Sequence, residues 1–110
     1  MVGSNIKSSA FGLAKGRDIK TDDFYAITST SNLTIAIVCD GVGSAEAGAE
    51  AAKRVTNYLL NNFKIRPRAW SIEKSISTFI SSINSILYEE GMANFERSEL
   101  LTTLALVVIE

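Results

Sequence analysis

The segment Leu33-Thr-Ile-Ala-Ile-Val-Cys-Asp-Gly-Val-Gly43 decides how this chain folds. Its first seven residues are β-branched or apolar almost throughout, which is typical of a strand in the middle of a sheet. Asp40 follows this strand directly, and the glycines beside it allow a ligand to approach the backbone closely. A carboxylate near a core is costly unless it is paired, hydrogen-bonded or bound to a cation. Asp40 is therefore the first candidate functional residue.

Two further strands are predicted on the N-terminal side of this segment. Ser9 to Leu13 has short alternating strand character, and Phe24 to Ser29 is the second candidate. A polar turn, Ser29 to Asn32, separates the latter from the central strand. This short link predicts an antiparallel hairpin between Phe24–Ser29 and Leu33–Cys39.

Two helices are predicted on the C-terminal side. Ser44 is a suitable N-cap for a helix that extends to about Phe63. Ser71 is a suitable cap for a second helix, and Gly91 is expected to end it. The first helix has one small or apolar stripe, formed by Gly48, Ala52, Val55, Leu59 and Phe63. The second has a larger core face, formed by Ile72, Ile76, Phe79, Ile80, Ile83, Ile86 and Leu87.

The last segment, Leu101 to Ile109, reads as a second buried strand. The predicted order is therefore β-β-β-α-α-β, which favours an α+β fold with a mostly antiparallel sheet backed by two antiparallel helices. The length of 110 residues suits a single domain. Because the sequence stops directly after a core strand, we expect residues 1–110 to form one partial domain.

Composition excludes several classes of function. The net charge is −1, with 46% hydrophobic and 21% charged residues, which does not suggest a nucleic-acid or membrane-surface protein. No apolar run reaches the length of a membrane span, and Met1 to Ser9 lacks the apolar segment of a secretory signal. The single cysteine, Cys39, fits a reducing compartment, so a cytoplasmic location is expected. Histidine is absent, which removes histidine bases and histidine metal ligands.

A group of acidic residues can converge on the end of the predicted hairpin. Asp22 and Asp23 precede one strand, and Asp40 follows its partner, so antiparallel pairing brings them to the same edge. Carboxylates without histidine or cysteine select Mg²⁺ or Mn²⁺ over zinc, and the Gly41 carbonyl can add a neutral oxygen ligand. Arg17 offers a forked donor for a phosphate group. Together these residues indicate metal-assisted phosphoryl chemistry.

In these motifs the sequence resembles the metal-dependent protein serine/threonine phosphatases of the protein phosphatase 2C type. Gly16-Arg17-(x)4-Asp22-Asp23-Phe24 is similar to the family's opening Arg…Asn-Glu-Asp motif, and Val38 to Gly43 is similar to its Asp-Gly-Val-Gly-Gly motif. Thr102-Thr103-Leu104 is similar to its Gly-Thr-Thr strand. The order of motifs and elements agrees over nearly the whole chain.

The resemblance implies half of an α-β-β-α sandwich and hydrolysis of phosphoserine or phosphothreonine in a protein substrate. It implies two Mn²⁺ or Mg²⁺ ions organised by Asp23, Asp40 and the Gly41 carbonyl, with Asp22 assisting and Arg17 holding the substrate phosphate. Asp22 stands where the family usually has Glu, and the link from Arg17 to the acid pair is one residue longer. The family's later metal-binding aspartates are expected beyond residue 110, so little turnover is expected from this chain alone.

Other interpretations of the same residues remain open. Asp40-Gly41 can be a plain turn, Asp22 and Asp23 can solvate a strand entrance, and Arg17 can be a turn cation. A haloacid-dehalogenase-like phosphatase expects a second Asp where Val42 stands, and the glycines fit no nucleotide-binding motif. A different class of function is a non-catalytic interaction module, which pairs with a second copy or a complementary half-domain through open sheet edges.

Overall fold

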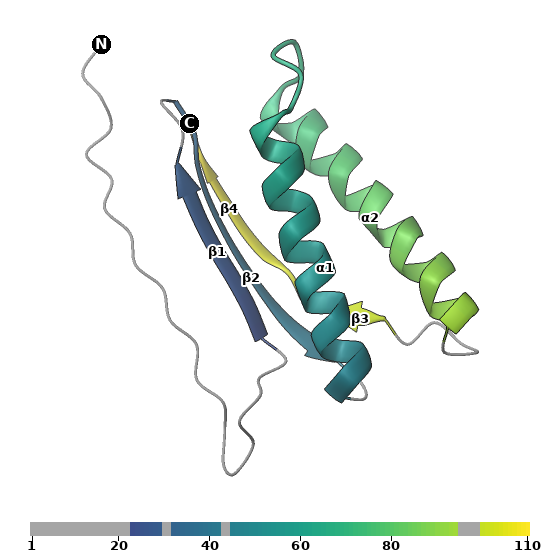
Figure 1. Cartoon of the computed structure of the whole chain (residues 1–110). Helices are drawn as coiled ribbons and strands as arrows, with labels where there is room; N and C mark the ends of the chain where they lie inside the picture. Colours follow the sequence, from purple (N-terminus) through teal and green to yellow (C-terminus); the bar gives the residue numbers. More distant parts are fainter. Residues whose placement is uncertain (1–22, 30–31, 43–44, 95–99) are drawn as a thin grey trace.

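The computed structural model describes residues 23–29, 32–42, 45–94 and 100–110, and it has the predicted α+β fold. A four-stranded antiparallel sheet forms one layer, and two helices cover one of its faces (Figure 1). The predicted strand Ser9–Leu13 lies outside the described residues. In chain order the elements are β1 (Asp23–Ser29), β2 (Thr34–Val42), α1 (Ala45–Lys64), α2 (Ile72–Asn94), β3 (Leu101–Thr102) and β4 (Ala105–Ile109).

Strand β2 is the centre of the sheet, as its composition predicts. It pairs antiparallel with β1 on one side and with β3 and β4 on the other. The predicted hairpin is therefore confirmed, with Ser29 opposite Thr34 at one end of the β1–β2 ladder and Asp23 opposite Asp40 at the other. A hydrogen bond of 3.0 Å joins Ser29 Oγ and Thr34 Oγ1 across the first of these pairs.

The predicted continuous strand Leu101–Ile109 is divided in two. Strand β3 pairs Thr102 with Gly41, and β4 pairs Ala105 with Val38. Residues 103–104 separate these positions on one side, and residues 39–40 separate their partners on β2. Because the two spacings are equal, β3 and β4 pair with β2 in one common register. The ladder is interrupted at residues 103–104 because the backbone there bonds differently, and this interruption lies opposite Asp40.

The two faces of β2 differ. Ile35, Ile37 and Cys39 point toward the helices and are almost fully buried. Val38 and Val42 lie on the opposite face of the sheet and are 53% and 44% exposed. The apolar run that predicts a central strand therefore indicates the position of β2 in the sheet correctly, although only one face of β2 is covered by described residues.

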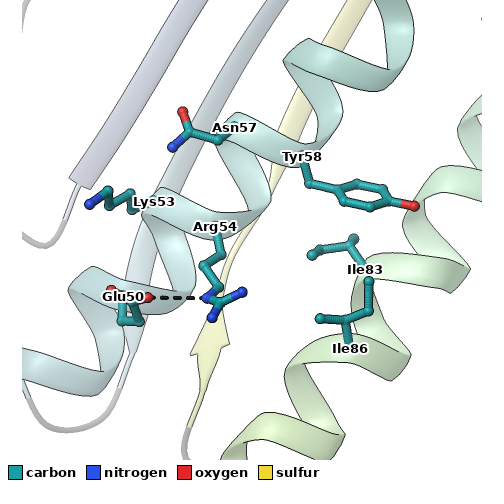
Figure 2. Close-up of a pocket in the computed structure, with 7 residues that line it drawn as sticks. All are labelled: Glu50, Lys53, Arg54, Asn57, Tyr58, Ile83 and Ile86. Atoms are coloured by element: carbon teal, nitrogen blue, oxygen red, sulfur yellow. Dashed lines mark hydrogen bonds and ion pairs between the residues drawn. The ribbon is translucent and has the colours of Figure 1, made fainter. Parts of the chain in front are cut away.

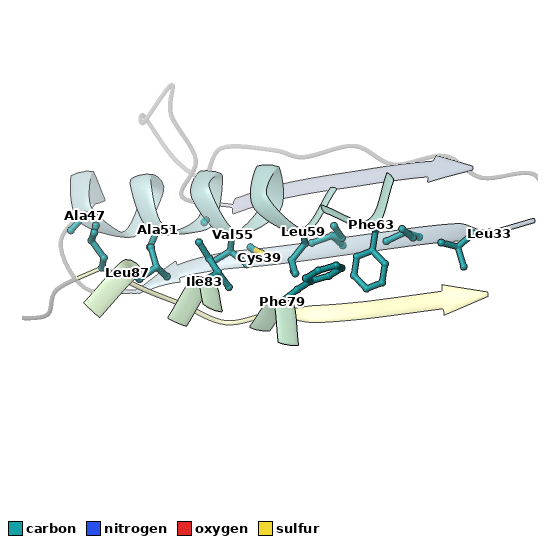
Figure 3. Close-up of a cluster of buried hydrophobic side chains, with 14 residues drawn as sticks. Leu33, Cys39, Ala47, Ala51, Val55, Leu59, Phe63, Phe79, Ile83 and Leu87 are labelled. Atoms are coloured by element: carbon teal, nitrogen blue, oxygen red, sulfur yellow. The ribbon is translucent and has the colours of Figure 1, made fainter. Parts of the chain in front are cut away.

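Helix α1 packs its predicted stripe against the sheet. Ala52, Val55, Leu59 and Phe63 are buried, and they share one core with β2 and α2 (Figure 3). Burial of a large aliphatic side chain stabilises a fold by about 1.5–3 kcal/mol, so this stripe is the main attachment of the helix. The opposite side of the helix is polar.

Helix α2 starts as predicted and ends later. Ser71 Oγ accepts a hydrogen bond of 3.0 Å from the Lys74 N–H, which is the geometry of an N-cap. Gly91 does not end the helix, which extends to Asn94, so that prediction is wrong. Ile80 is also not in the core, since it is 36% exposed, whereas Ser75 is fully buried and donates through its hydroxyl to the Ser71 carbonyl at 2.8 Å.

An aromatic cluster closes the end of the helix pair at the α1–α2 connection. Phe63 and Phe79 meet edge to face with ring centroids 5.1 Å apart, and Trp70 lies 6.0 Å from Phe79. Lys74 Nζ lies 4.9 Å from the centre of the Trp70 ring, and Arg66 donates to the Trp70 carbonyl at 2.9 Å. Arg66 and Lys74 therefore both have structural partners at this end of the helix pair.

Candidate functional site

Asp23 and Asp40 lie directly opposite each other on neighbouring strands. Both backbone polar groups of Asp40 are engaged on the side away from β1, because its carbonyl accepts from the Thr103 N–H at 2.9 Å and its N–H donates to Thr103 Oγ1 at 3.2 Å. Asp23 and Asp40 therefore form the narrow, non-hydrogen-bonded type of antiparallel pair. In such a pair the Cα atoms are about 4.5 Å apart and the side chains are closest.

Both carboxylates are on the face of the sheet that points away from the helices, and both are exposed. The expectation that Asp40 ends its strand beside the core is wrong, since β2 continues through Asp40 to Val42 and the Asp40 side chain faces outward. Like charges directly opposite each other across a ladder are destabilising. A cation between the two carboxylates would reverse the sign of that interaction.

Gly41 follows Asp40 at the point where β2 passes beneath the first turns of α1. A Cβ built on Gly41 would overlap the carbonyl of Gly48, and a Cβ built on Gly48 would lie 3.0 Å from the Gly41 carbonyl carbon. Both partners are backbone atoms, so neither can rotate away. The two glycines thus let helix and strand approach closely and fix the backbone of the residue after Asp40.

Cys39 precedes Asp40 and points to the other face of the sheet, into the core. Its side chain is fully buried and packs as a small apolar residue. Burial raises the pKa of the Cys39 thiol above its ordinary value, while the nearby hydroxyls of Thr56 and Thr102 lower it by a smaller amount. The buried Thr56 hydroxyl has no hydrogen-bond partner of standard geometry among the described residues. Because burial raises its pKa, the Cys39 thiol is a poor nucleophile.

The other predicted site residues, Arg17 and Asp22, lie outside the described residues. Within the part of the chain that the structure describes, no group of three or more His, Cys, Asp or Glu side chains is placed to hold a metal ion. What the fold brings together is a pair of carboxylates, Asp23 and Asp40, beside the Gly41 backbone. These are oxygen donors of the kind that Mg²⁺ and Mn²⁺ prefer, so the donor set fits such an ion in chemistry while supplying only part of its coordination.

Sequence patterns did not indicate that Thr103 contacts Asp40. Thr103 belongs to a motif noted for its family resemblance, but the pattern carries no information on which backbone groups its hydroxyl meets. The feature of the sequence that could have indicated this contact is the doublet Thr102-Thr103 inside an otherwise aliphatic run. Hydroxyl side chains compete with the backbone for the hydrogen bonds of a ladder.

A groove of about 310 Å³ lies elsewhere, between the two helices (Figure 2). Arg54 crosses it and forms ion pairs with Glu50 on its own helix, at 3.1 Å, and with Glu90 on α2. Tyr58, Ile83 and Ile86 also line the groove. The groove is on the helical side of the sheet, away from the face that carries Asp40.

Neither described helix has an apolar stretch long enough to cross a membrane.

Comparison with known proteins adds one finding. A family model described as protein phosphatase 2C matches residues 14–110 of this chain. The matched range contains the whole of the described sheet, both helices, and the positions of Arg17 and Asp22. Neither the curated proteins nor the solved structures gave a match.

Proposed function

Because the chain belongs to the protein phosphatase 2C family, we propose that residues 1–110 form a single partial phosphatase domain that acts on phosphoserine and phosphothreonine in proteins. The substrate is a phosphorylated protein, and neither nucleic acid nor membrane is a partner. A cytoplasmic location is part of the proposal, since one free, buried cysteine suits a reducing compartment.

The observation that carries this proposal is the cross-strand pair of Asp23 and Asp40 beside Gly41. In the proposal these two carboxylates and the Gly41 carbonyl hold Mn²⁺ or Mg²⁺. When bound, the divalent ions supply Lewis acidity toward the phosphate and lower the pKa of a water. Paired strands hold both acids opposite each other more rigidly than a flexible loop would.

Two further residues complete the proposed site. Asp22 precedes the first acid and assists in holding the metal, and Arg17 binds the phosphate of the substrate through its forked guanidinium. Asp40 and Asp23 carry the negative charge of the site, so Arg17 provides the attraction for a dianionic phosphate that the carboxylates alone would repel. The described residues bring only two carboxylates together, so little turnover is expected from this chain by itself.

Metal binding is the direct test of the proposal. Mn²⁺ is titrated into the chain and followed by calorimetry, and the loss of binding is compared between Asp40→Asn and Asp23→Asn. Glu73→Gln is the matched control, because Glu73 is an exposed carboxylate in the first turn of α2, remote from the hairpin end. The proposal requires that both Asn variants weaken binding and that the control does not. Equal binding by all four proteins would refute it.

Catalysis is tested separately with a phosphopeptide and an aryl phosphate, each with and without Mn²⁺. Weak or undetectable hydrolysis is expected. Robust metal-dependent hydrolysis that Asp40→Asn abolishes would show that the chain supplies a sufficient site, which contradicts the expectation of low turnover and supports the assignment of Asp40.

A second candidate function is a non-catalytic module that associates with another copy of itself. One observation favours it: large apolar side chains are exposed together on the outer face of the sheet, namely Tyr25, Val38, Val42, Leu101, Val107 and Ile109. Soluble monomers rarely expose a wide contiguous apolar area. Analytical ultracentrifugation of the wild type and of Val38→Lys distinguishes the cases, since self-association through this face requires a dimer that the lysine variant lacks. A monomer at all concentrations rules it out.

A further inference from the structure

Thr103 lies between β3 and β4, at the position opposite Asp40 in the register that these two strands share. In a regular antiparallel ladder, two such residues exchange two hydrogen bonds, each from an N–H to the other carbonyl. The first of these is present, from the Thr103 N–H to the Asp40 carbonyl at 2.9 Å. The second is not a backbone bond, because the Asp40 N–H donates to the hydroxyl Thr103 Oγ1 at 3.2 Å.

The neighbouring threonine accounts for the displaced carbonyl. In a regular ladder the Thr103 carbonyl would accept a hydrogen bond from the Asp40 N–H. Here it accepts one from Thr102 Oγ1 instead, at 2.9 Å. Thr103 Oγ1 also lies 3.4 Å from the Asp40 carbonyl oxygen. The Thr103 hydroxyl therefore contacts both the N–H and the carbonyl of Asp40, the proposed metal ligand. It does so at the only place where the β2 ladder is interrupted within the described residues.

We propose that Thr103 is a positioning residue that fixes the backbone of Asp40 and so keeps its carboxylate opposite Asp23. This proposal rests on the proposed metal-binding function of that pair. The register of the sheet does not need the hydroxyl, because the flanking pairs Gly41–Thr102 and Val38–Ala105 already define it. What the hydroxyl adds is a local constraint on one residue, in a gap where the backbone supplies only one of two bonds.

The chain offers a matched set of variants. Thr103→Val keeps the β-branched shape and removes the hydroxyl, whereas Thr103→Ser keeps the hydroxyl. Thr34→Val is the control, because it removes the hydroxyl bond between Ser29 and Thr34 at the far end of the same strand. If the Thr103 hydroxyl only stabilised the sheet as a whole, Thr103→Val and Thr34→Val would have the same effect in the measurements below.

Two measurements on the full chain test the proposal. The first is amide hydrogen exchange of Asp40 by NMR without metal. Loss of one hydrogen bond should speed exchange of this amide about three- to tenfold in Thr103→Val, while Thr103→Ser and Thr34→Val leave it near the wild-type rate. The second is a Mn²⁺ titration that follows paramagnetic broadening of the Asp23 and Asp40 amide signals. Here Thr103→Val should need about three- to tenfold more Mn²⁺, with rescue by serine.

The possible results separate this proposal from the metal proposal. Unchanged Asp40 exchange in Thr103→Val would overturn the positioning role, because the backbone carbonyl would then have replaced the hydroxyl. Faster exchange with unchanged broadening would also overturn it, since the constraint would not affect the ligand. If the wild type shows no broadening at all while the exchange result holds, the metal proposal fails and Thr103 keeps only its effect on the Asp40 backbone.

Discussion

Gly41 of β2 and Gly48 of α1 are in backbone contact, and neither position has room for a side chain. The contact joins the strand that carries Asp40 to the second turn of the helix that covers it. Because the obstruction at Gly41 is main chain, a substitution there must shift the strand or the helix, whereas a Cβ at Gly48 would make tight backbone contacts of 3.0 Å. The close approach of α1 to the sheet therefore depends on two glycines that are seven residues apart.

Alanine at Gly41 should destabilise the fold more than alanine at Gly48. At Gly41 the new methyl would overlap the Gly48 carbonyl, whereas at Gly48 the nearest atom would be 3.0 Å away. Overpacking typically costs about 1–3 kcal/mol, and Gly41→Ala should lie at or above the upper end. Gly48→Ala regains about 1 kcal/mol from helix propensity, so its net loss should be smaller. Urea denaturation of both variants checks the order, and a more stable Gly41→Ala would contradict it.

The ion pair between Arg54 and Glu90 should contribute little and should depend on salt. The side chains are 40% and 31% exposed, so solvent screens the interaction. A double-mutant cycle with Arg54→Met and Glu90→Gln should give a coupling energy below about 1 kcal/mol in low salt, falling toward zero at high ionic strength. A coupling that is large or independent of salt would show that the helix pair relies on this contact.

Replacement of Thr56 by valine should leave stability unchanged or raise it. Among the described residues, the buried Thr56 hydroxyl has no hydrogen-bond partner of standard geometry, and its neighbour, the Cys39 thiol, is only a weak partner. An unsatisfied buried polar group costs about 1–3 kcal/mol. Valine has the same shape, whereas Thr56→Ser keeps the hydroxyl and loses a buried methyl, so serine should destabilise. Thermal unfolding of the two variants is the measurement. Marked destabilisation by valine would indicate that this hydroxyl has a partner, such as a bound water.

Cys39 should make stability fall at alkaline pH. Burial raises the pKa of its thiol in the folded protein above the ordinary value of 9.0. Between those two pKa values the unfolded chain loses a proton that the folded chain retains, so the contribution is complete below the unfolded pKa and is lost as pH rises through the folded one. The slope is at most about 1.4 kcal/mol per pH unit.

Comparison with Cys39→Ala isolates the contribution of the thiol from every other cause of pH-dependent stability. Unfolding free energies of both proteins are measured between neutral pH and about pH 10, a range chosen to include the ordinary thiol pKa. The wild type should lose more stability across this range than the alanine variant. Parallel curves would mean that Cys39 does not change its protonation on unfolding.

Sequence periodicity was sufficient for most of the fold. The hairpin of β1 and β2 follows from two apolar runs with a short polar link, and the buried stripe of α1 follows from the spacing of Val55, Leu59 and Phe63. Both features come from repeating patterns, in which many residues point to the same answer. The opposition of Asp23 and Asp40 follows from the hairpin once its ends are known.

Features that depend on single contacts could not be read in this way. Gly91 has the statistics of a helix end, but α2 continues past it, because packing of the helix outweighs the preference of one residue. The break between β3 and β4 arises from the hydroxyls of Thr102 and Thr103, which replace backbone groups without changing the register. Metal binding by Asp22 and phosphate binding by Arg17 remain predictions.

The aromatic cluster at the α1–α2 connection gives the molecule a built-in optical reporter. Trp70 is the single tryptophan, and its ring lies against Phe79 and beneath the Lys74 ammonium. Helix α1, about 30 Å long for its 20 residues, separates this reporter from the hairpin end that carries Asp40 (Figure 1). Intrinsic fluorescence therefore monitors the helical layer without direct quenching by an ion at Asp40. A change in Trp70 emission on adding Mn²⁺ would thus be a signal transmitted along the length of α1.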